Sequence, residues 1–116
     1  MKAMRSDRWP GSLYQPELRV EQRVSVSCRG ALILGDVSAP CVIQNMCSRG
    51  FLIKSTKELP VGQFLRLRCE LYPSESIECT VQVRRVSAEC LGAKVIEISD
   101  HEKTLCRQFL EEQRRS

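Results

Sequence analysis

The chain has 116 residues, 28% of them charged and 42% hydrophobic, with a formal net charge of +4. This length suits one small domain with a modest core. No apolar run approaches the roughly 20 residues of a membrane span, and the N-terminus lacks the apolar core of a signal peptide. We therefore expect a cytoplasmic protein with no membrane span. The mild basic excess suits an anionic ligand, and a solubilising surface charge explains it equally well.

The seven cysteines do not form a recognisable metal or disulfide pattern. Their number is odd, no pair has the CxxC spacing, and the single histidine is His101. We expect no metal and no cofactor, and we expect Cys28, Cys69 and Cys79 to pack as small buried hydrophobic residues. The sequence also has no Ser-His-Asp or Cys-His set and no phosphate-binding P-loop, which argues against an enzyme.

Residues 1–16 show no periodicity and contain Pro10, Gly11 and Pro16. This composition predicts a flexible N-terminal arm in front of a domain that covers residues 17–116. Arg8 and Trp9 stand out in the arm because they offer a charge and a stacking face, which could fold over a bound nucleotide. Alternatively, Trp9 simply anchors the arm against the domain.

The rest of the chain alternates between strand patterns and turn signals. Val24, Val26 and Cys28 face one side of a half-buried strand that continues to Leu34, before a turn at residues 35–36. Alternation or apolar runs predict five more strands, over residues 41–44, 51–54, 65–71, 77–84 and 91–96. Six short antiparallel strands at regular spacing indicate a mainly β protein with a small closed or nearly closed barrel.

The last segment changes to a helical period. Ser99 and Glu102 have the spacing of a capping box, which marks a helix N-terminus. The residues that follow at helical spacing form one apolar stripe: Leu105, Cys106, Phe109 and Leu110. We expect this C-terminal helix to lie across an open end or face of the sheet and cover its core.

Two segments carry the candidate chemistry. Arg19 and Arg23 are four residues apart and directly precede the first strand, and guanidinium forks match phosphate oxygens and guanine edges. Asn45 lies at the end of an apolar run and is followed by a short turn that ends at Gly50. Glycine at this position indicates a positive φ or the close approach of another group.

Together these segments resemble the RxxxR and [D/N]xSxxG motifs of the PilZ domain family, the bacterial receptors for cyclic di-GMP. Arg19 and Arg23 match the arginines, Asn45 and Gly50 match the ends of the second motif, and Cys47 replaces its serine. The resemblance implies that the two arginines bind guanine and phosphate of cyclic di-GMP. Asn45 would donate and accept at a guanine edge, and Gly50 would keep the turn open.

In element order the resemblance extends over about residues 17–113. It implies a six-stranded antiparallel β-barrel with a C-terminal α-helix, in agreement with the pattern of strands. It also implies a second-messenger function in motility or biofilm regulation.

Cys47 is the departure from the motif. A thiol donates and accepts hydrogen bonds more weakly than a hydroxyl, and the loss of one such bond costs ~1 kcal/mol, or about five- to tenfold in affinity. Ser48 is a further candidate, but neighbouring side chains of an extended backbone point in opposite directions. We therefore expect ligand binding at reduced affinity.

The leading hypothesis is a stand-alone cyclic di-GMP receptor whose arm becomes ordered on binding and signals to an unidentified downstream protein. A degenerate PilZ-like adaptor that binds a protein without nucleotide is the alternative favoured by Cys47. A nucleic-acid-binding barrel is a third possibility, but such barrels display clustered aromatic residues. Phe51, Phe64 and Tyr72 form no such set in the sequence, so we expect no nucleic acid partner.

Overall fold

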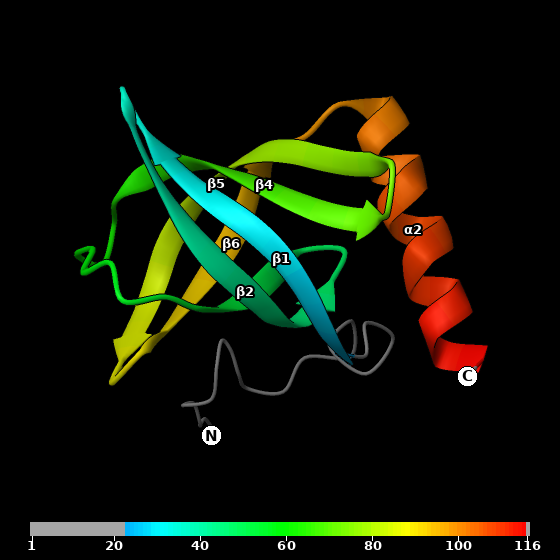
Figure 1. The fold of residues 1–116 in the computed structure, drawn as a ribbon, viewed down its shortest axis with the longest axis horizontal. Helices are drawn as coiled ribbons and strands as arrows, with labels where there is room; N and C mark the ends of the chain where they lie inside the picture. Colours follow the sequence, from blue (N-terminus) through cyan, green and yellow to red (C-terminus); the bar gives the residue numbers. More distant parts are fainter. Residues whose placement is uncertain (1–22, 116) are drawn as a thin grey trace, which may run out of the picture.

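The computed structural model describes residues 23–115. Its elements in chain order are β1 (Val24–Leu34), β2 (Val37–Cys47), β3 (Gly50–Lys54), β4 (Phe64–Tyr72), β5 (Glu75–Ser87), β6 (Cys90–Glu97) and α2 (Asp100–Arg115). The strands pair antiparallel and close into a barrel in the order β1-β2-β3-β6-β5-β4 (Figure 1). The predicted six-stranded antiparallel barrel with a C-terminal helix is confirmed, whereas the predicted arm over residues 1–16 lies outside the described residues.

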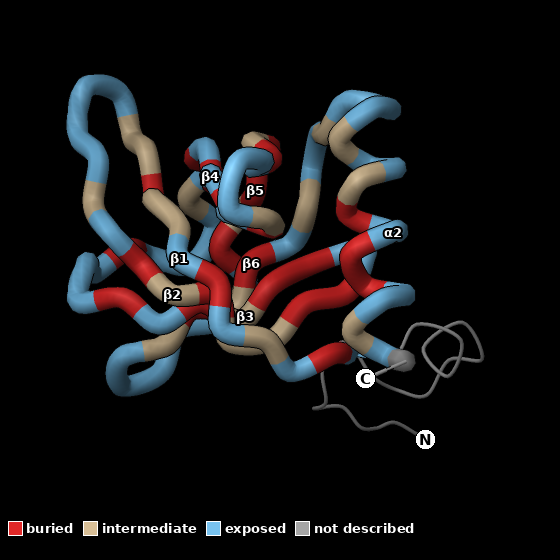
Figure 2. Tube along the Cα trace, turned by 45° about the vertical axis from the view of Figure 1, so that its right-hand side comes forward, coloured by how far each residue is buried: buried red, intermediate tan, exposed pale blue. Residues whose placement is uncertain are grey.

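The core fills the barrel because the strands alternate between apolar and polar residues. In β4, for example, Leu65 and Leu67 are buried and the intervening Arg66 is exposed. Figure 2 shows that the buried stretches run along the middle of the strands and along one side of α2. The barrel interior is therefore a packed core, and the polar side chains of the strands lie on its outer surface.

Cysteines contribute to this core as small apolar residues. Cys28, Cys69 and Cys79 are buried, which confirms their predicted place. Burial raises the pKa of Cys41 to about 11 and that of Cys79 to about 12. These two thiols therefore stay protonated at neutral pH and are poor nucleophiles.

Helix α2 covers the barrel with its apolar stripe, as predicted, and contacts β1 and β5. Cys106, Phe109 and Leu110 are buried there. The Phe109 ring meets Tyr72 of β4 edge to face, with ring centres 5.6 Å apart. Tyr72 Oη donates a 2.7 Å hydrogen bond to Glu112, which raises the pKa of Tyr72 to about 12. Among residues 23–115, no helix has both the length and the apolar character needed to cross a bilayer.

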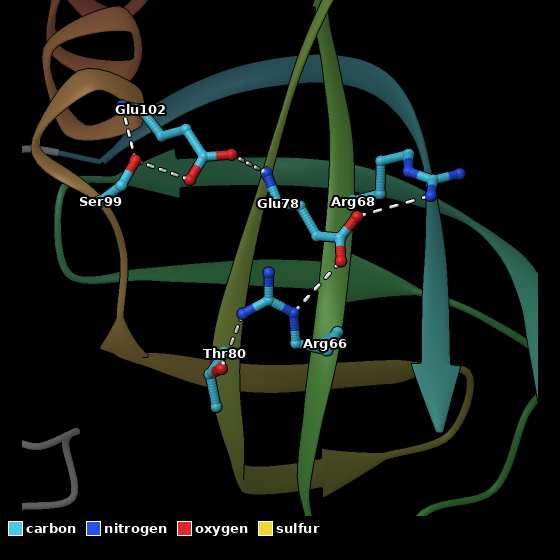
Figure 3. A network of polar contacts seen from close by, with 6 residues as sticks. All are labelled: Arg66, Arg68, Glu78, Thr80, Ser99 and Glu102. Carbon is cyan, nitrogen blue, oxygen red and sulfur yellow. Dashed lines mark hydrogen bonds and ion pairs between the residues drawn. The ribbon is translucent and has the colours of Figure 1, made fainter. Parts of the chain in front are cut away.

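The N-terminus of α2 is tied to β5 through Glu102 (Figure 3). The Glu102 N–H donates to Ser99 Oγ at 3.2 Å, and Ser99 Oγ donates to Glu102 Oε1 at 2.9 Å, which confirms the cap at Ser99. Glu102 Oε2 accepts a 2.9 Å bond from the Glu78 N–H. Since the described β5–β6 ladder begins only at Thr80, the Glu102 carboxylate takes the place of a strand partner at Glu78.

Two register shifts distort the barrel beside the predicted motif. The β1–β2 ladder shifts between Ser25 and Cys28, and the β2–β3 ladder shifts between Ile43 and Asn45. Strict alternation from Ile43 would turn Asn45 inward. With one extra residue in β2, both Ile43 and Met46 are fully buried and Asn45 lies on the outer surface.

Candidate functional site

The two motif segments meet at one end of the β1–β2–β3 sheet. Cys47 pairs with Gly50 across the turn formed by Ser48 and Arg49. Val24 pairs with Met46, and Arg23 directly precedes Val24. The exposed Arg23 therefore lies at the same end of the sheet as this turn. The other predicted ligand residues of the N-terminal segment, Arg8, Trp9 and Arg19, lie outside the described residues.

Asn45 presents its amide on the outer surface of β2. Its side chain is half-buried, and Asn45 Oδ1 accepts a 3.3 Å hydrogen bond from Ser25 Oγ on β1. This bond holds the amide by its carbonyl oxygen. The amide nitrogen carries the donors, and donors are what the N7 and O6 acceptors of guanine require.

Cys47 lies on the same side of β2 as Asn45, two residues further on. Only 8% of the residue is exposed, yet it is not part of the hydrophobic core that contains its neighbour Met46. The thiol is thus on the outer side of the barrel with little of its surface accessible. Ser48, in contrast, is exposed in the turn.

Gly50 is required by a close approach of β6, and its φ does not lie in the left-handed region. A Cβ atom at this position would stand 2.6 Å from the carbonyl oxygen of Ala93, which is backbone and has no freedom to move aside. The turn is also fixed to β6 by the Val95 N–H, which donates to the Arg49 carbonyl at 2.8 Å. The motif glycine therefore has a structural reason within the barrel itself.

The strand register extends the motif into two rows on the outer surface. The first row crosses five strands and contains Ser25, Asn45, Leu52, Gly92 and Arg85. The second row contains Cys47, Gly50, Lys94, Gln82 and Phe64. We call the area covered by these two rows the outer face.

The middle of the outer face contains glycines, and basic side chains lie beside it. Gly50 and Gly92 raise no side chains above its middle, and Leu52 supplies a half-buried apolar surface between them. Arg85 and Lys94 are exposed at its β5–β6 side. A partly apolar surface beside cations suits a ligand that carries both planar rings and negative charge.

Sequence reasoning missed the contribution of β5 and β6 to this surface. Glycine is unfavourable in the interior of a strand, so Gly92 was a signal that another group approaches the backbone there. Arg85 gave no such signal, because simple alternation from Val83 turns it inward.

Two surface pockets of the described residues lie elsewhere. One, of about 370 Å³, is lined by residues of β1, β4 and α2, and the other, of about 250 Å³, lies beside the loop at Ser55 and the β5–β6 turn. Neither is lined by Arg23, Asn45, Cys47 or Gly50.

The aromatic residues of the described strands do not form a stacking platform. Phe51 is 2% exposed in the core, and Tyr72 packs on Phe109 of α2. Phe64 is 52% exposed but has Gln82 opposite it on β5. This arrangement argues against the nucleic-acid-binding alternative.

The sequence matches the family model described as "PilZ domain" over residues 17–112. The chain belongs to the PilZ domain family. PilZ domains form a family of cyclic di-GMP receptors and effectors, which bind ligands and partner proteins. A search of functionally curated proteins found no match for this PilZ domain.

Solved structures show the same fold. The Bacillus subtilis inhibitor of motility MotI/DgrA superposes with a TM-score of 0.71 at 18% identity over 83% of this chain. This PilZ domain spans about half of that protein, 51% of its length. An uncharacterised Legionella protein superposes with a TM-score of 0.52 at 16% identity, over 82% of this chain and 99% of its own.

Proposed function

We propose that this PilZ domain is a cyclic di-GMP receptor and that Arg19, Arg23, Asn45, Cys47 and Gly50 form its ligand site. The observation that carries the proposal is the placement of Arg23 at the same end of the sheet as the Asn45–Gly50 turn, in a chain of this family. Cyclic di-GMP has two phosphates and two guanines. Arginine can serve both, because its guanidinium is permanently charged, forked and flat.

The ligand acts as a switch by ordering the N-terminal segment. Arg8, Trp9 and Ser48 are further candidates for contacts in the bound state, since they supply a cation, a stacking face and a hydroxyl. An ordered segment offers a new surface to a downstream protein. By linkage, a partner that prefers the bound shape strengthens ligand binding by the same factor that the ligand strengthens partner binding.

Calorimetric titration with cyclic di-GMP tests the proposal. The wild-type protein should bind, and Arg19→Ala combined with Arg23→Ala should abolish the heat of binding. Arg107→Ala, which removes an exposed arginine of α2, is the matched control and should bind like the wild type. Absence of heat with folded wild-type protein at tens of micromolar ligand contradicts the proposal.

A second candidate function is a protein adaptor that needs no nucleotide. The observation in its favour is the low accessibility of Cys47, which is only 8% exposed. An adaptor should retain its partner in the Arg19→Ala, Arg23→Ala double variant, whereas a receptor that depends on ligand should lose it. Pull-down of the partner by both proteins, with and without cyclic di-GMP, separates the two functions.

A further inference from the structure

A bulge in β5 brings an additional arginine to the outer face. Val83 pairs with Ala93, but the next pair in the ladder joins Arg85 to Gly92, so that Arg84 is the extra residue. Without the bulge, Arg84 would pair with Gly92 and Arg85 would turn toward the core. With it, Arg84 and Arg85 are both exposed, and only Arg85 lies in the row that contains Asn45.

The row fixes the distance between Arg85 and the predicted motif. Gly92 pairs with Leu52 on its other side, and Leu52 pairs with Asn45. Three strand spacings of about 4.8 Å separate Asn45 from Arg85, roughly 14 Å along the surface. A ligand that carries two purines can extend across these strands, and the long Arg85 side chain shortens the gap further.

Gly92 keeps the surface low beside Arg85. A Cβ atom at Gly92 would stand 3.4 Å from Arg85 Cβ and 4.0 Å from its Cγ and Cδ. The aliphatic stem of Arg85 thus runs along the notch that the glycine leaves, and Leu52 borders the notch on the other side. Leu52, Gly92 and the stem of Arg85 therefore form an apolar surface, and the same arginine carries a positive charge.

We infer that Arg85 is a ligand-contacting residue of the site, one that lies outside both sequence motifs. One base of the cyclic dinucleotide rests on Leu52 and Gly92, and the Arg85 guanidinium stacks on it or pairs with the adjoining phosphate. Asn45 and Arg23 contact the other part of the ligand. The inference rests on the proposed receptor function. It assigns to Arg85 of β5 a contact that determines how the ligand is oriented.

Arg85→Gln and Arg84→Gln form a matched pair that tests the inference. Both remove one exposed charge from neighbouring positions of β5, but the bulge places only Arg85 opposite Gly92. Calorimetric titration with cyclic di-GMP should show about tenfold or greater weakening for Arg85→Gln, because a charge-assisted contact is lost. Arg84→Gln should change the affinity by about twofold or less, since it alters only the screened surface field.

The outcomes separate the two claims. If the wild type binds and both variants weaken binding equally or not at all, Arg85 is not a ligand contact and the receptor proposal stands. If folded wild-type protein does not bind cyclic di-GMP, the receptor proposal fails and the role of Arg85 fails with it. Thermal melting of each variant confirms that the exposed substitutions leave the fold intact.

Discussion

At the scale of single residues, the two glycines of the outer face have different roles. A side chain at Gly50 would overlap the backbone carbonyl of Ala93, whereas one at Gly92 would meet the flexible stem of Arg85 only at ordinary van der Waals distance. We predict that Gly50→Ala destabilises the fold by about 1–3 kcal/mol, as expected for overpacking against a rigid neighbour. Gly92→Ala is the control and should cost clearly less. Urea denaturation midpoints of the two variants measure the difference, and equal midpoints would contradict the assignment.

Cys47 replaces the serine of the PilZ motif and is only 8% exposed. Under the receptor proposal, Cys47→Ser restores the stronger donor and acceptor and should raise the affinity for cyclic di-GMP about fivefold, corresponding to ~1 kcal/mol. Cys47→Ala removes the group and should lower the affinity or leave it unchanged. Titration of both variants provides the measurement. An alanine variant that binds as tightly as the serine variant would exclude a polar contact at this position.

At the scale of elements, alternation, apolar runs and a helical period with a capping box were sufficient to predict the six strands and the capped helix. They were not sufficient for the bulges at Gln44 and Arg84, because a bulge breaks the alternation on which the prediction depends. These bulges decide that Asn45 and Arg85 face outward. The residues of the second motif could therefore be named from the sequence, while the surface around them could not.

The attachment of α2 to β5 predicts an acid-dependent loss of stability. Burial of Glu102 opposes its ionisation, but hydrogen bonds from the Glu78 N–H and from Ser99 outweigh this and lower the pKa of Glu102 below its usual 4.5. A lowered pKa means that the stabilisation is complete above about pH 4.5 and is lost as the pH falls through the pKa of the folded state. Glu102→Ala should cost about 1 kcal/mol at neutral pH, the usual cost of a lost cap.

Glu102→Gln isolates the ionisation from the cap. Its free energy of unfolding should fall less steeply than that of the wild type between neutral pH and about pH 3, since the glutamine has no charge to lose. Glu58→Gln, which alters an exposed loop carboxylate, is the control and should keep the wild-type slope. If Glu102→Gln also keeps that slope, the carboxylate of Glu102 is not a source of the acid sensitivity.

At the scale of the whole molecule, the fold class and the order of elements followed from the sequence. The sequence did not decide between a closed and a nearly closed barrel. Closure rests on the pairing of β1 with β4, which runs from Gly30–Cys69 to Ile33–Arg66. Such contacts between distant parts of the chain leave no periodic signal. The register of the β1–β4 pairing therefore could not be predicted from the sequence and is known only from the structure.

A ligand that binds the folded chain should stabilise the entire domain. At 100 times its dissociation constant, cyclic di-GMP should contribute about 2.7 kcal/mol. For a domain of this size that corresponds to a rise in melting temperature of roughly 10 °C. Thermal melting with increasing cyclic di-GMP measures the effect, and GMP is the control because it lacks the paired nucleotides. An unchanged melting temperature at high ligand concentration would contradict the receptor proposal.

Ring closure also restricts how another protein can recognise this domain. Because each described strand is paired on both sides over part of its length, the backbone groups left for a foreign strand are confined to limited stretches, such as β1 before Gly30. Even the stretch of β5 at Glu78 that lacks a β6 partner has its N–H occupied by Glu102. Under the receptor proposal, we expect a downstream protein to recognise mainly side chains of the barrel exterior, so that substitutions there change which protein it binds.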